Sequence, residues 1–321
     1  MEIFITNDSA LEFWRLHRRS RKDSVYHPCS RKPPCESPSS KELRREGVLK
    51  LTLPLDIMVG SLGARRPSKA VRPWVCTKPL PAGSFVNAGG GLIVSSPEFC
   101  FLQMAAEYPL AKLIALGLEI CGSYSLPPKP SAGTDKNETE KALYNMPQLS
   151  SQKKLKAFIS RMKGWVGQKQ ALKALRYIAD SSASPMETAL FILLTLPYRY
   201  GGYGFPSPEL NGRIDPEKGA KRFVGREYYR GDLLWRKAGV VAEYNSDAEH
   251  TGPEKIASDA IRRGDLDLCG IYEVTVTKRQ LYNSELLENA AVQISKKIGR
   301  QLRYKDPGFS KARHELRSLL L

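Results

Sequence analysis

Residues 230–250 read RGDLLWRKAGVVAEYNSDAEH and predict two neighbouring strands joined by a short turn at Lys-Ala-Gly. Apolar and β-branched residues dominate both runs, and the glycine suits the turn between them. Each strand carries one acid, Asp232 in the first and Glu243 in the second. Because the run Val-Val-Ala leads directly into Glu243, we expect these acids in the most apolar part of a small sheet.

An isolated ionised carboxylate in such a place costs several kcal/mol, so this position requires compensation. A divalent cation held by Asp232 and Glu243 would provide it, because Mg²⁺ binds one or two carboxylates together with waters and phosphate oxygens. The same ion activates water and stabilises the charge that develops on a cleaved phosphodiester. Each acid also has a plainer interpretation: Asp232 follows Gly231 and caps a turn, and Glu243 pairs with Arg236 or Lys237.

The surrounding sequence predicts two domains. Residues 151–321 follow the order helix, turn, strand, strand, helix, strand, helix, which predicts an α/β fold with a mixed central sheet flanked by helices. In residues 1–126, the N-terminal EIFIT predicts a short strand followed by a helix, and residues 48–126 alternate between β-branched runs and turn clusters before changing to helical spacing. Together they predict a smaller α+β domain. The string PPKPSAGTDKNETEK between them is typical of a linker, which we place at 127–150.

The C-terminal region resembles a known nuclease family. From about Ser184 to Arg303, the motifs SPMET, LPYRYGGYGF, RGDLLWRKAGVVAEYNSDAEH and GDLDLCGIYEVTVT resemble the Vsr-like (very short patch repair) branch of the PD-(D/E)XK restriction-endonuclease-like superfamily. The resemblance implies a restriction-endonuclease-like fold and a metal-dependent DNA endonuclease. It also implies four catalytic residues: the two strand acids Asp232 and Glu243, the acid Glu187 on the preceding helix, and the histidine His250.

One position departs from that family pattern. The family has a lysine two residues after the second strand acid, and this chain has Asn245 there. Some Vsr-like members also lack the lysine, so we keep Asn245 as a catalytic candidate that would orient water. His250, Arg262 or Arg263 would then supply the proton transfer or the positive charge, and the two arginines are DNA-contact candidates. The Ser184-Pro185 pair predicts a helix start, and a capping role at that start is the plainer alternative for Glu187.

The N-terminal region resembles a second family more weakly. The segments LPLDIMVG, ARRPSKAVRPWVCTKPLP and GLIVSSPEFCFLQMAAE resemble the C-terminal domain of AbiEi-type antitoxin and regulator proteins. That resemblance implies a partner protein from a defence or toxin–antitoxin system. The basic loop with Arg65, Arg66, Lys69 and Arg72 suits phosphate contacts that position nucleic acid without reading its sequence. An exposed turn of a small domain explains the same residues equally well.

The composition favours a polyanionic partner. The chain has 321 residues, and 50 Lys plus Arg against 33 Asp plus Glu give a formal net charge of +17. DNA is the leading candidate, and solubility alone is the alternative explanation of this charge. Six scattered cysteines predict neither a disulfide framework nor a four-ligand zinc site. The sequence shows no signal-peptide pattern and no apolar run of membrane-spanning length, so we expect a cytoplasmic protein without a membrane partner.

The leading hypothesis is a DNA endonuclease, or a nuclease-derived defence protein, that hydrolyses phosphodiester bonds with Mg²⁺ or Mn²⁺. The competing hypothesis is a non-catalytic DNA-binding regulator or antitoxin-like module with a degenerate nuclease site. A homodimer would provide the two active sites that double-strand cleavage needs, although the sequence shows no self-complementary apolar seam.

Overall fold

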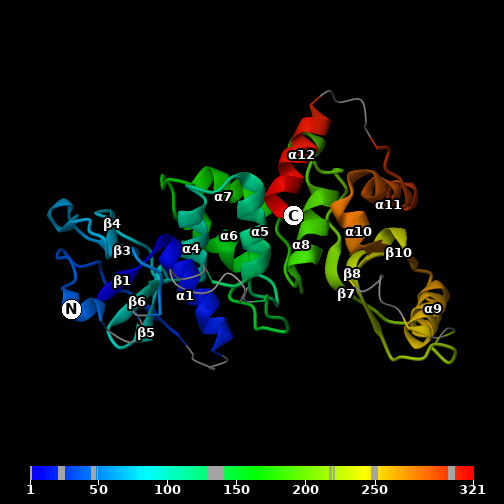
Figure 1. Ribbon diagram of the computed structural model, residues 1–321, viewed down its shortest axis with the longest axis horizontal. Helices are drawn as coiled ribbons and strands as arrows, with labels where there is room; N and C mark the ends of the chain where they lie inside the picture. The colour runs from blue at the N-terminus through cyan, green and yellow to red at the C-terminus, as the bar shows by residue number, and fades with distance from the viewer. Residues whose placement is uncertain are drawn as a thin grey trace. The chain divides into compact units, whose positions relative to one another are not determined.

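The computed structural model describes residues 2–20, 26–44, 48, 50–128, 141–216, 219, 221–246, 252–302 and 308–321. The chain divides into two units, Met1–Arg176 and Tyr177–Leu321. Each unit consists of one sheet with helices packed on it (Figure 1). Within the described ranges, no helix combines the length and the apolar character that crossing a membrane requires.

The first unit contains a mixed six-stranded sheet in the order β2-β5-β6-β1-β3-β4. β1 lies inside the sheet, parallel to β6 and antiparallel to β3, and the pair β3 and β4 is parallel. The short strand predicted at the N-terminus is therefore confirmed. The strands are β1 Ile3–Ile5, β2 His27–Cys29, β3 Leu55–Val59, β4 Val71–Val75, β5 Phe85–Gly89 and β6 Leu92–Ser95.

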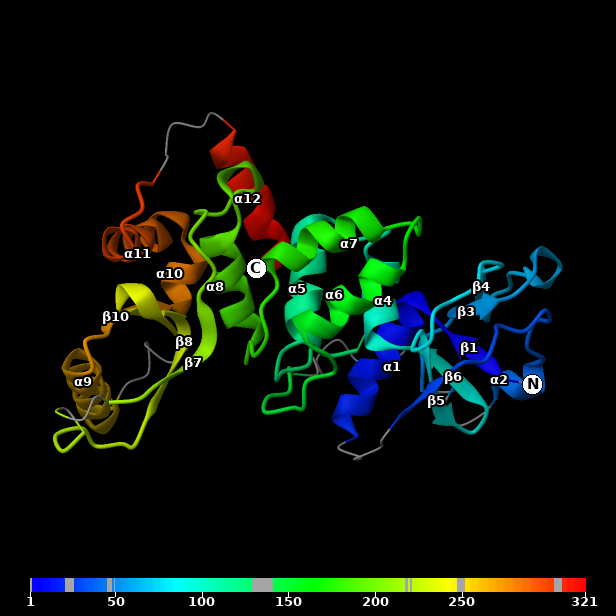
Figure 2. The same cartoon turned by 180° about the vertical axis from the view of Figure 1, so that it is seen from behind.

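Apart from the short α2, the helices of this unit gather on one side of the sheet in both views (Figures 1 and 2). A buried aromatic series of Phe4, Phe85 and Phe99 connects sheet and helices through edge-to-face contacts at 5.0 and 5.6 Å. The helices are α1 Asn7–Arg19, α2 Ser40–Leu43, α4 Pro97–Met104, α5 Leu110–Ile120, α6 Gln152–Arg161 and α7 Gln168–Ala174.

The second unit contains a mixed four-stranded sheet in the order β10-β9-β8-β7. β7, β8 and β9 form an antiparallel meander, and β10 returns parallel to β9 after the crossover helix α9. The two acid-bearing strands, β8 and β9, are thus the inner strands, as the sequence predicts. The strands are β7 Glu209–Ile214, β8 Tyr229–Trp235, β9 Val240–Asn245 and β10 Tyr272–Thr277.

Helices cover both faces of this second sheet. α8 and α9 lie on opposite sides of it in both views (Figures 1 and 2). α8 starts as predicted, because Ser184 caps it by accepting a hydrogen bond from the backbone N–H of Glu187, and Pro185 occupies its first turn. The helices are α8 Pro185–Thr195, α9 Pro253–Leu268, α10 Lys278–Tyr282, α11 Ser284–Lys297 and α12 Phe309–Leu320.

The observed boundary between the units differs from the prediction. We expected a linker at 127–150 and a second domain at 151–321. The structure instead divides the chain after Arg176. α6 and α7 belong to the first unit because they pack against α4 and α5, which buries Leu155, Phe158 and Ile159. The first unit is consequently the longer one, although it was expected to be the smaller. Residues 129–140 of the expected linker lie outside the described residues.

Candidate active site

The turn between β8 and β9 brings the two strand acids together. A 3-10 turn over Arg236–Ala238 ends at Gly239, whose φ of 60° lies in the left-handed region. A Cβ atom at Gly239 would stand 2.7 Å from the carbonyl oxygen of Gly270, so a larger residue does not fit there. The antiparallel register pairs residue 233 with residue 242, which makes Asp232 and Glu243 neighbours at the next step along the strands.

The carboxyl groups of Asp232 and Glu243 contact each other. Glu243 lowers the pKa of Asp232, and the charge of Asp232 raises the pKa of Glu243, so each carboxyl group acts on the other. Asp232 Oδ2 also accepts a hydrogen bond of 2.8 Å from the backbone N–H of Tyr244. The side chain of Glu243 is only 16% exposed. Two carboxyl groups this close favour holding a proton, because both cannot ionise without repulsion.

Burial and neighbouring negative charges raise the pKa values of both acids. Burial is the main cause of the increase in the pKa of Asp232 to about 7, and the charge of Glu187 adds to it. For Glu243, burial and then the charge of Asp232 raise the pKa to about 9. Two carboxyl groups that share a site titrate as a pair, and such perturbed pairs are frequent at functional sites.

Arg262 from α9 is the counter-ion of Glu243. Its Nη2 atom donates a hydrogen bond of 2.5 Å to Glu243 Oε1 and another of 3.0 Å to the carbonyl oxygen of Arg230. Its guanidinium group also lies 5.9 Å from the centre of the Tyr229 ring. This charge lowers the pKa of Glu243 against the upward effect of burial. The plainer pairing of Glu243 with Arg236 or Lys237 is wrong for Arg236, which pairs with Glu209 at 2.5 Å.

Glu187 lies within electrostatic range of Asp232 and is itself buried. Its carboxylate accepts hydrogen bonds of 3.0 Å from the backbone N–H of Ala183 and 2.9 Å from Asn211 Nδ2. Burial raises the pKa of Glu187, and its charge in turn raises the pKa of Asp232. Glu187 therefore stabilises the start of α8, as its plainer interpretation predicts, while it also contributes negative charge to the site.

Sequence analysis missed a further acid, Glu273 on β10. Its side chain is 9% exposed, and its Oε2 atom has no hydrogen-bond partner within the described part of the chain. That atom lies 3.8 Å from Arg262 Nε, and the charge of Glu273 raises the pKa of Glu243. The sequence IYEVTVT predicts this strand, but only its parallel register, which pairs Thr275 with Glu243, places Glu273 beside the site.

The remaining predicted site residues divide into two groups. Asn245 ends β9 and, with Glu243, Arg262, Arg263 and Glu273, lines a hollow of about 330 Å³. The structure thus brings Asn245 and both arginines to the edge of the carboxyl pair. His250 lies outside the described residues.

The donor set suits one divalent cation held by two carboxylates. Among the described residues, no three His, Cys, Asp or Glu side chains converge closely enough to hold one metal ion together. A cation at Asp232 and Glu243 would therefore take its other ligands from water and substrate oxygens, which is usual for Mg²⁺. To bind that cation, Glu243 would have to lose any proton it holds and give up its contact with Arg262.

The predicted basic loop of the first unit contains three exposed cations. Arg65, Arg66 and Lys69 are exposed just before β4. Arg72, on β4, is exposed as well, and Asp56 engages its guanidinium group through hydrogen bonds of 2.5 and 2.9 Å.

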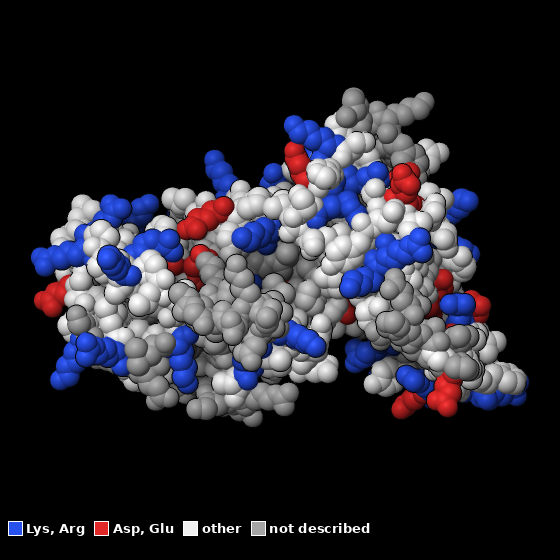
Figure 3. All heavy atoms as spheres, in the orientation of Figure 1, with Lys and Arg blue, Asp and Glu red and all other residues white. Residues whose placement is uncertain are grey.

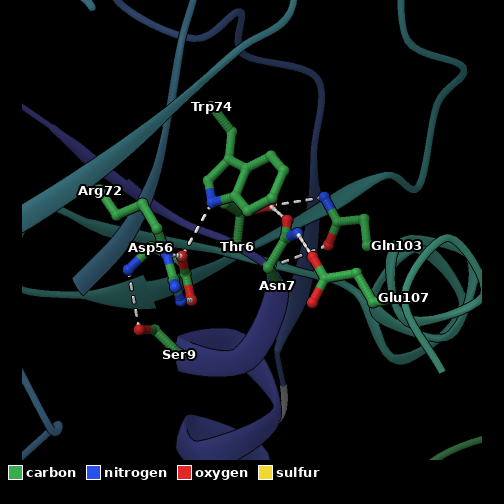
Figure 4. A network of polar contacts seen from close by, with 8 residues as sticks. All are labelled: Thr6, Asn7, Ser9, Asp56, Arg72, Trp74, Gln103 and Glu107. Carbon is green, nitrogen blue, oxygen red and sulfur yellow. Dashed lines mark hydrogen bonds and ion pairs between the residues drawn. The ribbon is translucent and has the colours of Figure 1, made fainter. Parts of the chain in front are cut away.

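Asp56 is a buried acid that organises this region. It is 1% exposed, and it also accepts a hydrogen bond of 2.8 Å from Trp74 Nε1 (Figure 4). The backbone N–H of Asp56 donates a hydrogen bond to the hydroxyl oxygen of Ser9. Arg72 thus compensates the charge of a buried carboxylate, while its own side chain remains half exposed.

Surface charge alone does not select a binding face. In Figure 3, Lys and Arg side chains are spread over the visible faces of both units, with Asp and Glu among them. Comparison with models of protein families, with curated proteins and with solved structures found no match to this chain. The geometry of the site itself is therefore what indicates the function.

Proposed function

We propose that the protein is a DNA endonuclease that uses Mg²⁺ or Mn²⁺ and has Asp232 and Glu243 at its centre. The observation that carries the proposal is the pairing of two half-buried carboxyl groups on neighbouring strands, whose pKa values are raised well above their usual range. Such a pair is unfavourable when ionised, and a bound cation would relieve the repulsion. This is the compensation that the sequence requires for acids in the middle of a small sheet.

The topology of the second unit supports the proposal. A helix bearing Glu187 precedes an antiparallel meander, Asp232 and Glu243 occupy successive inner strands, and a crossover helix leads to a parallel fourth strand. This arrangement agrees with a restriction-endonuclease-like core. The exposed Arg65, Arg66 and Lys69 of the first unit would hold DNA by its phosphates.

Each residue of the site would have a defined part in phosphodiester hydrolysis. The cation, when bound, would lower the pKa of water and stabilise the charge on phosphate oxygens. Asp232 and Glu243 would hold it, and Asp232 would keep its orientation through the Tyr244 backbone N–H. Arg262 would provide positive charge for the phosphate in place of the missing lysine, and Asn245 would orient water by hydrogen bonding.

Nicking of supercoiled plasmid by the purified full-length protein tests the proposal. We expect nicking with Mg²⁺ or Mn²⁺ and none in EDTA. Asp232→Asn and Glu243→Gln should each reduce the rate about a hundredfold or more, as loss of a group that stabilises the transition state does. The matched control is Glu209→Gln, which removes a charge from the same sheet at a half-exposed position, and it should retain full activity. Nicking that persists in Asp232→Asn at the original rate would refute the assignment.

A second candidate function is a DNA-binding regulator with a degenerate nuclease site. The presence of Asn245 at the lysine position and the engagement of Glu243 by Arg262 favour it. Under this alternative, wild-type protein binds DNA and fails to nick it with either cation at any salt concentration.

A further inference from the structure

The segment between β7 and β8, which leads into the strand that carries Asp232, exposes two aromatic rings. Phe223 is 64% exposed and Tyr228 is 38% exposed. The residue that follows each of them is directed inward instead: Val224 packs against the buried cluster that includes Leu266, and Tyr229 is buried. Leaving an aromatic ring in water gives up a large part of its burial free energy, so two exposed rings on one short segment require an explanation.

This segment is held in position by α9. Asp265, which is 7% exposed, accepts a hydrogen bond of 3.1 Å from the backbone N–H of Gly225 and another from the hydroxyl group of Tyr229. With Val224 in the apolar cluster, these bonds attach both ends of the stretch 224–229 to the same helix. The outward direction of Phe223 and Tyr228 is therefore a consequence of the fold.

Arginines accompany both exposed rings. The guanidinium group of Arg222 lies 4.8 Å from the centre of the Phe223 ring. Those of Arg213 and Arg230 lie 4.3 and 5.7 Å from the centre of the Tyr228 ring. Guanidinium groups and aromatic rings present flat faces on which nucleic-acid bases stack, and the arginines also attract the phosphates.

We propose that this aromatic–basic segment, consisting of Arg213, Arg222, Phe223, Tyr228 and Arg230, binds the unpaired bases of single-stranded DNA. The inference rests on the proposed function and adds a substrate class to it. A duplex hides the faces of its bases within the stack, whereas unpaired bases can stack on exposed rings. Tyr228 precedes Asp232 by four residues, so an extended strand places them about 13 Å apart. Bases held on the segment would bring a neighbouring phosphate to the carboxyl pair.

Binding of labelled oligonucleotides to full-length protein in EDTA tests the inference without any cleavage. Fluorescence anisotropy should give an affinity for a single strand of mixed sequence about tenfold or more above that for a duplex of equal length. Tyr228→Ala and Phe223→Ala should each weaken single-strand binding by about 5- to 100-fold, the range expected for losing the stacking of one base. Both should leave duplex binding within about twofold of the wild-type value.

Three further variants separate stacking from other effects. Tyr228→Phe keeps the ring and should keep the affinity, whereas Tyr228→Leu keeps an apolar side chain and should lose it. Tyr282→Ala removes a ring that is 48% exposed elsewhere in the same unit and should change nothing.

The possible outcomes are distinct. Equal losses for single strands and duplex in Tyr228→Ala, or no loss for either, would overturn the assignment of unpaired bases. Stronger binding to a single-stranded RNA of the same sequence would overturn the choice of DNA. Because no divalent cation is present, these outcomes do not depend on whether the protein cleaves DNA, and a negative nicking assay leaves them unchanged.

Discussion

The carboxyl pair should make the second unit less stable as the pH rises when no metal is present. A carboxyl group whose pKa is higher in the folded state than in the unfolded state favours folding only while it stays protonated. Below about pH 4 both states are protonated and the group has no effect. Between that pH and the folded pKa values of about 7 for Asp232 and about 9 for Glu243, the unfolded state loses protons first, and stability falls.

The size of the effect follows from the pKa of Asp232. A rise from the usual 3.8 to about 7 corresponds to an upper limit of about 4 kcal/mol, at 1.4 kcal/mol per pH unit. Water reaching the partly exposed site reduces this value, so we expect a loss of about 2 kcal/mol between pH 5 and pH 8 in EDTA. Asp232→Asn should recover most of that loss at pH 8, because its amide can still accept the hydrogen bond from the Tyr244 backbone and donate to Glu243.

Hydrogen exchange followed by mass spectrometry measures the local stability of the two strands that carry Asp232 and Glu243. Peptides from residues 229–245 report the opening of β8 and β9, after correction for the intrinsic exchange rate at each pH. Millimolar Mg²⁺ at pH 8 should restore protection in the wild type and leave Asp232→Asn unchanged. The control Glu209→Gln should leave the pH dependence intact, because Arg236 lowers rather than raises the pKa of Glu209. Protection that stays constant from pH 5 to pH 8 in EDTA would refute the reasoning.

Three other changes have defined outcomes. Arg262→Gln removes a charge that lowers the pKa of Glu243. Because Glu243 must lose its proton to hold the cation, the pH of half-maximal nicking should move upward by about one unit in a pH–rate profile. Arg72→Ala leaves Asp56 buried with less compensation and should destabilise the first unit by about 2 kcal/mol in urea titrations, since the arginine is half exposed. In Gly231→Ala, the new Cβ would lie 2.3 Å from Val241 Cγ2; the cost should be about 1 to 3 kcal/mol in thermal unfolding, and Val241→Ala should relieve it.

Local patterns in the sequence were sufficient for several parts of the candidate site. The apolar runs around Asp232 and Glu243 predict the two inner strands, and the structure confirms them. Gly239 predicts the turn, and Ser184 with Pro185 predicts the start of α8. These features depend on side chains a few residues apart, whose geometry the backbone fixes within one strand, turn or helix start.

Other features could not be read from neighbouring residues. Helices α6 and α7 have ordinary amphipathic sequences, and which unit they join depends on which apolar surface they cover. The domain boundary was therefore misplaced at the linker, although the linker itself has the expected composition. The aromatic–basic segment was missed for a similar reason, because the sequence does not reveal that Val224 and Tyr229 turn inward while Phe223 and Tyr228 remain exposed.

The sequence by itself determined the secondary structure around the acids and the presence of two carboxylates on successive strands. Only the tertiary structure decided the partners of the charges: Arg262 for Glu243, Asp56 for Arg72, and Glu273 as an additional acid at the site. The physical reason is that electrostatic interactions depend on distance and burial, which strand register and helix packing set between residues far apart in the chain.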